Sequence, residues 1–398
     1  MWCMGEASGG VDLADSAFHV DPHRTWARLR EAAPVHRCRA EDGSPAWVLT
    51  RYADIRDAHV DPRFTMDKRA SAGGYAGFNL PPELDENLLN RDGDVHRRLR
   101  RLVAGAFTPR RIAALRTHIE AVANEHAEQL AAQPTADVVT DYAAMIPIKV
   151  IGGLLGVPPE QQGLFRSWVN GMFAHDPNQV RTAIAEIHAF LRGLIDTKRA
   201  CPSDDLLSDL VTLRDDGDRL DEHELLSTTM LLMLAGYENP VHGIGNATAA
   251  LLTHRDQWHA LQDTPELLPA AVDELLRFGP PAALGIRRFA VQPVTLGGCT
   301  IKPGDTVLFG QMAAHRDPRQ YDSPDLLDIK RNPSRGMAFG HGVHFCIGAA
   351  LGHAEIELAL AALLRHAPRM TLACDPADLQ WRRSTRSRGL LSLPVTLN

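Results

Sequence analysis

The stretch that decides the fold is Phe339-Gly-His-Gly-Val-His-Phe-Cys346-Ile-Gly348, which holds one cysteine among three glycines. Glycines let the backbone bend tightly, so the amide N–H groups of such a turn can point at the sulfur. An apolar helix, GAALGHAEIELALAALL, is predicted directly after the turn. Because a helix N-terminus favours negative charge on a neighbouring sulfur, the segment predicts a site that keeps Cys346 as a thiolate.

Three interpretations of Cys346 are open on this local pattern. An ordinary buried thiol is the commonest fate of a lone cysteine. A catalytic nucleophile is less favoured, because Phe345 and Ile347 flank the sulfur and no hydrolase pattern surrounds it. A thiolate ligand for iron fits the pattern best.

The composition of the 398 residues excludes several classes of protein. Lys and Arg total 42 against 49 Asp and Glu, a net charge of −7, which argues against nucleic acid and anionic membranes as partners. Six cysteines without a C-x-x-C pair exclude a disulfide scaffold and a zinc finger. The first residues, MWCMGEASGGVDLAD, lack the pattern of a signal peptide. We expect a soluble, cytoplasmic, monomeric protein.

The hydrophobic pattern predicts a mainly helical chain with β-rich ends. The clearest helix runs from Asp221 to His254, because Asp221 and Glu224 form a capping-box pattern. We expect further elements in this order: a short helix and strands at Val35–Ala40 and Ala46–Thr50, a long loop at Ala70–Asn90, helices through most of Val95–His254, a helix at Pro265–Phe278, short strands between Leu284 and Val307, a helix from Cys346 to about Arg365, and strands in the tail.

The cysteine segment resembles the haem-binding loop of the cytochrome P450 family, F-x-x-G-x-H/R-x-C-x-G. Every fixed position of that pattern is met, at Phe339, Gly342, His344, Cys346 and Gly348. The resemblance continues in order from about Asp21 to Val395 and is strongest to the soluble bacterial branch.

The resemblance implies a mainly α, single cytochrome P450 domain over 1–398. Its β-rich part would come from 1–70, about 284–310 and 370–398, and its helical part from 95–278 and 346–366. It also implies haem b (iron protoporphyrin IX) as cofactor, with Cys346 as the axial ligand of the haem iron and Phe339 beside it.

A second motif of the family is matched by Glu274-Leu-Leu-Arg277, which lies 69 residues before the cysteine (346 − 277). Charges three residues apart share one face of a helix, but such pairs are common on surfaces. Arg331 resembles the further arginine of this network. The resemblance implies that these three residues hold the loop beneath the haem and do no chemistry.

Haem carries two propionates, so a buried haem needs cations nearby. His96 and Arg100 lie four residues apart in DVHRRLRR and resemble the propionate pair of the family. Arg288 and His344 resemble further propionate contacts. A solvated basic helix face is the alternative for His96 and Arg100.

The long helix contains Ala235-Gly-Tyr-Glu-Asn-Pro240, which breaks helix rules at Gly236 and Pro240. Pro240 has no N–H for the carbonyl of Gly236, so a kinked structural helix is one reading. The family pattern here is A-G-x-D/E-T, whose glycine leaves room for dioxygen and whose acid and hydroxyl relay protons. Gly236 and Glu238 match it, whereas Asn239 replaces the threonine.

An amide can hydrogen-bond water but cannot pass a proton as a hydroxyl does. Two hypotheses follow from Asn239. In the first, protons reach the bound oxygen through Glu238, ordered water or a hydroxyl of the substrate. In the second, part of the activated oxygen is released as hydrogen peroxide. Peroxide-driven relatives also lack the threonine, but they replace the acid too, so Glu238 favours a monooxygenase.

The resemblance places the substrate pocket in five segments. The residues expected to line it are Leu88 and Leu89 of the Ala70–Asn90 loop, the Phe165–Phe173 region, Ala235, Ala283 and Leu284 of Ala282–Ile286, and Leu390 of Arg388–Leu390, with His175 and Asp176 as polar candidates. The small side chains at 282, 283 and 285 favour a roomy pocket, although they could equally serve packing.

No flavin or iron–sulfur domain is recognisable, so the resemblance implies electrons from a ferredoxin and ferredoxin reductase with NAD(P)H. Candidate basic contacts for the ferredoxin are Arg98, Arg101, Arg110, Arg111 and Arg335, each of which could be a plain solvated arginine.

The predicted function is insertion of one oxygen atom into a C–H or C=C bond of a medium or large organic molecule, in secondary-metabolite tailoring. Two rivals stay open. One is a peroxide-driven or oxidative-coupling enzyme, and the other is a haem protein that binds a ligand without turnover.

Overall fold

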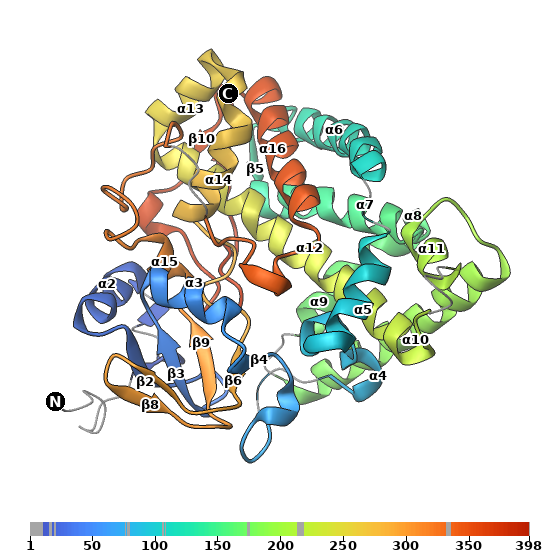
Figure 1. Ribbon diagram of the computed structural model, residues 1–398. Helices are drawn as coiled ribbons and strands as arrows, with labels where there is room; N and C mark the ends of the chain where they lie inside the picture. Colours follow the sequence, from blue (N-terminus) through green and yellow to red (C-terminus); the bar gives the residue numbers. More distant parts are fainter. Residues whose placement is uncertain are drawn as a thin grey trace. The chain divides into compact units, whose positions relative to one another are not determined.

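The computed structural model describes residues 11–15, 18–19, 21–75, 77, 80–105, 107, 109–172, 176–212, 219–331 and 336–397. Figure 1 shows its helices and strands along the chain. The described residues form two compact units. Unit 1 takes its residues from Met1–Phe78, His242–Ala349 and Pro368–Asn398, and unit 2 from Asn79–Val241 and Ala350–Ala367.

Unit 1 is built on a mixed β-sheet with the strand order β1-β2-β3-β9-β6-β4. In Figure 1 the blue strands β2 and β3 lie beside the orange β9. The strands of this sheet are β1 (Val11–Asp12), β2 (Val35–Arg39), β3 (Pro45–Leu49), β4 (Phe64–Thr65), β6 (Arg288–Ala290) and β9 (Thr306–Phe309). Val48, Leu49 and Phe309 of this sheet are buried and form part of the core of unit 1.

The other strands and helices of unit 1 are short, apart from the end of the longest helix. They are α2 (Pro22–Ala32), α3 (Tyr52–Val60), η1 (Lys68–Ala70), α13 (Arg255–Asp263), η4 (Pro265–Leu267), α14 (Leu268–Phe278), β7 (Val294–Leu296), β8 (Cys299–Ile301), α15 (Gln311–His315), η5 (Gly342–His344), β10 (Thr371–Leu372), η6 (Pro376–Asp378) and β11 (Pro394–Thr396). Helix α15 packs against both α2 and α3. Its five residues are all buried, so it forms part of the core of unit 1.

Unit 2 is almost wholly helical. Its elements are α4 (Pro82–Asp85), η2 (Leu88–Asn90), α5 (Gly93–Ala104), α6 (Pro109–Ala131), β5 (Thr135–Asp137), the π-helix η3 (Val139–Ala143), α7 (Met145–Leu154), α8 (Pro159–Gln162), α9 (Leu164–Met172), α10 (Pro177–Ala200) and α11 (Leu206–Thr212). Helix α16 (Ala349–His366) is tied to this unit by Tyr142, whose Oη donates to the carbonyl of Ala359 at 2.7 Å. Arg116 adds an ion pair to Glu357 of α16 at 2.6 Å.

The longest helix is α12 (Glu222–Thr253), whose 32 residues extend for about 48 Å. Its first part belongs to unit 2 and its last twelve residues, from His242, to unit 1. The predicted capping box is confirmed: the N–H of Glu224 donates to Asp221 Oδ1 at 2.8 Å, and the N–H of Asp221 donates to Glu224 Oε2 at 3.0 Å. Two amide groups at the start of the helix are thereby satisfied.

The mainly α fold with a small β-rich part is confirmed. The sequence reading missed α3, α13 and α15, and it treated 70–90 as one loop, whereas α4 and η2 interrupt it. The helical stretch 95–254 also contains β5 and η3. These misses are short elements, in which local propensity is weak and tertiary packing decides the conformation. That the two units act as one domain over 1–398 stays a prediction.

Removal of the α12 cap should lower stability measurably. We expect Asp221→Ala to reduce the free energy of unfolding by about 1 kcal/mol, because the N–H of Glu224 loses its acceptor. Urea unfolding of the haem-loaded protein would measure this change. The neighbouring exposed position supplies the control, His223→Ala, and an equal loss there would refute the cap assignment.

Candidate active site

Cys346 lies in a tight loop that ends at α16. Its N–H donates to the carbonyl of Phe339 at 2.9 Å, and the N–H of Phe345 donates to Gly342 at 3.0 Å. Gly342 has φ +73°, and a Cβ there would stand 2.8 Å from Val60 Cγ1 of α3. Only glycine therefore suits this turn, because both the backbone angle and the space exclude a side chain.

The thiol of Cys346 is exposed, which rules out the interpretation as an ordinary buried cysteine. Cys38 is a contrast within unit 1: it is buried, and burial raises the pKa of its thiol to about 12. Two apolar neighbours of Cys346 are also open, with Val343 62% and Phe345 43% exposed. An accessible sulfur beside exposed apolar side chains fits a large, mainly apolar group seated on this loop.

Basic groups gather near this loop in unit 1. Burial, together with the electrostatic influence of nearby Arg288, His341 and His344, lowers the pKa of His59 to about 3. Arg288 is 4% exposed, and its Nη1 donates to the carbonyl of Ile286 at 2.9 Å. A set of charges of one sign suits an anionic group such as a propionate. Sequence reasoning identified Arg288 and His344 but missed His59, which belongs to no motif.

His96 and Arg100 lie one turn apart on α5 in unit 2. His96 is only 2% exposed and Arg100 is half-buried. A solvated basic face therefore does not describe His96. A buried imidazole four residues from a guanidinium is a donor pair that a carboxylate could accept from.

Helix α12 is buried along most of its length but opens at one stripe. Ala235 and Asn239, four residues apart, are exposed, and Leu231 and Leu234 beside them are half-buried. Glu238 lies on the same face of the helix but is buried, with 7% of its surface exposed. The accessible stripe is thus apolar except for a single amide, that of Asn239.

Gly236 has a packing role in unit 2. A Cβ at this position would lie 2.7 Å from Cδ1 of Ile151 on α7, so the missing side chain allows α7 and α12 to approach closely. Pro240 lies within α12 and has no N–H for the carbonyl of Gly236. The role in dioxygen binding that the resemblance implies for Gly236 stays a prediction.

The structure brings Glu274, Arg277 and Arg331 together in unit 1. Arg277 donates to both carboxylate oxygens of Glu274, at 2.6 and 2.8 Å, and Arg331 Nε donates to Glu274 Oε1 at 3.2 Å. Glu274 and Arg277 are each 3% exposed. The remaining donors of Arg277 bind the carbonyls of His315 and Pro324, both at 2.8 Å, so the buried charges are fully hydrogen-bonded.

The predicted pocket residues differ in their surroundings. Ala283 and Leu284 are buried in a core cluster of unit 1 with Trp26 and Met312, so packing is the role that the structure gives them. Ile286, in the same segment, is 41% exposed. Leu390 and Leu88 are buried and Leu89 is half-buried.

Other candidates have local structural partners or lie outside the described part of the chain. Asp176 caps α10 by accepting from the N–H of Asn178 at 2.9 Å. Arg98 pairs with Glu224, and Arg111 pairs with Asp209. Phe173, His175 and Arg335 lie outside the described residues.

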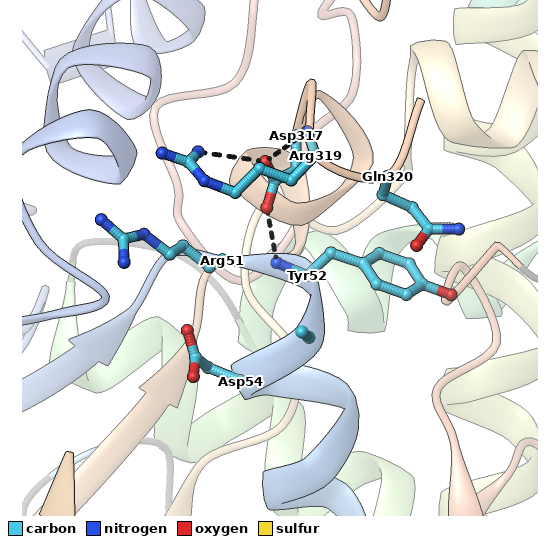
Figure 2. A pocket seen from close by; sticks show the side chains of 7 residues that line it. Arg51, Tyr52, Asp54, Asp317, Arg319 and Gln320 are labelled. Carbon is cyan, nitrogen blue, oxygen red and sulfur yellow. Dashed lines mark hydrogen bonds and ion pairs between the residues drawn. The ribbon is translucent and has the colours of Figure 1, made fainter. Parts of the chain in front are cut away.

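A shallow pocket lies at the start of α3, lined by Arg51, Tyr52, Ala53, Asp54, Asp317, Arg319 and Gln320. Figure 2 shows Asp317 between its two partners, the main chain of Tyr52 and the side chain of Arg319. Asp317 Oδ2 accepts from the N–H of Tyr52 at 3.0 Å, and Asp317 Oδ1 accepts from Arg319. These bonds cap the helix, and none of the residues belongs to the predicted site.

Comparison with known proteins assigns the family. A family model described as Cytochrome P450 matches residues 147–367. The chain belongs to the cytochrome P450 family. It is 40% identical over 388 residues to the Vitamin D(3) 25-hydroxylase of Pseudonocardia autotrophica, covering 97% of this chain and 96% of that protein. It is 41% identical to the cytochrome P450 monooxygenase PikC of Streptomyces venezuelae, covering 95% and 91%.

A solved structure carries the same fold. The P450 PksS of the bacillaene polyketide synthase from Bacillus subtilis superposes with a TM-score of 0.91 at 36% identity, covering 97% of this chain and 99% of that one. The protein is a P450 monooxygenase of the bacterial type. In the described part of the chain, no helix has the length and apolar character needed to span a membrane.

The residues of this P450 fit the haem-thiolate cofactor that its family implies. Cys346 would hold the iron, and Arg288, His344, His96 and Arg100 would hold the propionates. When bound, the haem supplies the activation of dioxygen. The residues of the chain would present the thiol of Cys346 to the iron and neutralise the carboxylates of the haem.

Glu355 of α16 is a buried acid that sequence reasoning missed. Its side chain is 2% exposed, and its Oε1 has no hydrogen-bond partner among the described residues. Burial raises the pKa of this carboxyl from 4.5 to about 8, so the group is protonated in the folded protein at neutral pH. Nothing local in the sequence distinguishes Glu355 from Glu357, which pairs with Arg116.

Disruption of the Glu274–Arg277 pair should be severe. We expect Glu274→Gln to cost about 3–5 kcal/mol, because it leaves the buried guanidinium of Arg277 without its counter-charge. The yield of soluble, haem-loaded protein and its urea midpoint would measure this cost. The half-exposed pair of Arg319 and Glu31 provides the control, and Glu31→Gln should change stability by about 0–1 kcal/mol.

Glu355 should make stability fall as pH rises. Between pH 4.5 and about 8 the folded protein holds a proton on Glu355 that the unfolded chain releases, so each pH unit removes up to about 1.4 kcal/mol. We expect Glu355→Gln to flatten the stability profile between pH 5 and 8. Urea unfolding at several pH values would test this, with exposed Glu120→Gln as control. An unchanged slope in Glu355→Gln would contradict the assignment.

Proposed function

We propose that this P450 inserts one oxygen atom of O2 into a C–H or C=C bond of a medium or large organic substrate, as a tailoring step of secondary metabolism. The exposed Cys346 thiol, in a loop that meets every fixed position of the haem-binding pattern, is the observation that carries the proposal. The relatives add support, since PksS is named for a polyketide synthase and another relative hydroxylates vitamin D3 by its name.

The open stripe of α12 suggests the chemistry of the substrate. Leu231, Leu234 and Ala235 offer apolar surface, and Asn239 offers one donor and one acceptor at the end of that surface. A molecule with an extended apolar body and a hydroxyl or carbonyl near the oxidised carbon would match this arrangement.

Proton delivery is the step for which this chain departs from its family. Asn239 can order a water molecule but cannot relay a proton. Glu238 is the acid nearest to it in sequence and is buried, and the Gly236 carbonyl, which receives no N–H from Pro240, can accept from water. We propose that protons reach the site through Glu238 and water or through a hydroxyl of the substrate, with Asn239 orienting the donor.

Asn239→Thr tests this departure. If the amide orients the donor, the variant should change the product formed per electron by several-fold, because a hydroxyl places and relays protons differently. Product, peroxide and NADPH consumption would be measured together once a substrate is known. An unchanged ratio would dismiss a special role for the amide. The matched control is Asn178→Thr, a change at the exposed end of α10.

The electron donor is proposed to be a separate ferredoxin with its reductase and NAD(P)H. Arg98 and Arg111 are half-buried, whereas Arg101 and Arg110 are exposed, so the latter two are the better candidates for contact with an acidic partner. Electrostatic docking weakens as salt screens it. We expect reduction by ferredoxin to slow several-fold between low and physiological ionic strength, and Arg110→Glu to slow it at low salt. A reduction rate that does not change with ionic strength would contradict an electrostatic contact at this surface.

The decisive test of the function uses the purified, haem-loaded protein. A reduced carbon monoxide complex with the red-shifted thiolate Soret band, followed by product formation with ferredoxin, reductase and NAD(P)H, would support the monooxygenase. Product formation with hydrogen peroxide alone would favour the peroxide-driven rival. Spectral shifts with metabolites but no turnover in either assay would favour a ligand-binding haem protein.

A further inference from the structure

Two side chains of α15 hydrogen-bond to the main chain of Met337, which lies nine residues before Cys346. The N–H of Met337 donates to Nε2 of His315 at 3.2 Å. Nε2 of Gln311 donates to the carbonyl of Met337. Because Gln311 and His315 are four residues apart, they project from one face of α15 and meet the two sides of the same residue.

These two hydrogen bonds lie in the core of unit 1. His315 is fully buried, Met337 is 2% exposed and Gln311 is 8% exposed. Burial, together with the charges of Arg277 and Arg316, lowers the pKa of His315 to about 3, so the imidazole is neutral and its Nε2 accepts. The proton is then on Nδ1, which has no hydrogen-bond partner among the described residues. A buried N–H donor without a hydrogen bond lowers the stability of the folded protein. The presence of His315 at this position therefore indicates a functional role for its side chain.

Two hydrogen bonds, joined through the backbone of Phe339 and Gly340, connect Met337 to the cysteine. The carbonyl of Met337 also accepts from the N–H of Gly340 at 2.9 Å, which closes the first turn of the loop. The carbonyl of Phe339, inside this turn, accepts from the N–H of Cys346 at 2.9 Å. The position of the Met337 peptide therefore determines where the amide of Cys346 is held.

Helix α15 is itself firmly held. Arg277 Nη1 donates to the carbonyl of His315 at 2.8 Å, and Arg30 Nη1 donates to the carbonyl of Ala313 at 2.9 Å. Both arginines are buried, and each is anchored by an acid, Glu274 and Asp317. The helix thus gives Gln311 and His315 a rigid base from which to fix the loop.

We propose that His315 and Gln311 are positioning residues for the thiolate. By fixing both polar groups of Met337, they hold the loop from Met337 to Cys346 in the conformation that presents the sulfur to the haem iron. This role goes beyond the proposed function and depends only on thiolate ligation. It holds for any substrate and any electron donor.

The test measures ligation instead of turnover. In the purified holoenzyme, the reduced carbon monoxide complex reports the ratio of thiolate-ligated to neutral-thiol haem, followed in urea below the unfolding midpoint. His315→Phe and Gln311→Met each remove one hydrogen bond at similar volume and should lower this ratio about ten-fold. The double variant should fall little further than the stronger single variant, because both changes release the same peptide. His315→Gln, which restores an acceptor, should stay within about two-fold of the wild type.

Buried His126 of α6 supplies the control, since it is 8% exposed and lies in unit 2, off this path. His126→Phe should lower the urea midpoint without changing the ligation ratio. If His315→Phe does not fold, Gln311→Met decides alone. A wild-type ratio in folded Gln311→Met, or an equal fall in His126→Phe, would overturn the proposal.

Discussion

The buried ion pair between Glu274 and Arg277 is the interaction on which the organisation of the cysteine loop depends. Two charges removed from water are tolerated only when each is bound, and here the guanidinium binds the carboxylate and the carbonyls of His315, Pro324 and Leu326. Those carbonyls belong to α15 and to the segment before Arg331. The pair therefore fixes the backbone of the helix from which Gln311 and His315 bind Met337.

Function in this P450 is concentrated where local rules are broken. Within unit 1, Cys346 is exposed whereas Cys38 and Cys299 are buried. Helix α12 carries Gly236 and Pro240 in its interior, and between residues 225 and 252 its exposed positions are Ala235 and Asn239. Asn239, at the end of the stripe, replaces the hydroxyl that the family uses. Such departures cost stability, and they persist at sites where the chemistry needs them.

Sequence patterns predicted the features whose defining residues lie close together in the sequence. The capping box at Asp221 and Glu224, the long helix and the cysteine turn all have short spacings, and the geometry of each agrees with its pattern. Sequence patterns could not show that Ala283 and Leu284 are core residues while Ile286 is exposed. The burial of these three side chains depends on which distant elements pack against their segment. Sequence patterns also passed over α15, whose five residues are too few for a helical period.

The amino-acid sequence by itself determined the family, the cysteine turn and the acid–arginine motif, because each depends on residue types at short, fixed intervals. Tertiary structure alone decided that His59 joins the basic cluster, that Glu355 is a protonated buried acid and that Gln311 and His315 meet Met337. These relations join residues that are close in space and separated along the chain, or depend on exclusion of water. Closeness in space and exclusion of water cannot be predicted from a local sequence pattern, because both arise only when helices and strands pack together.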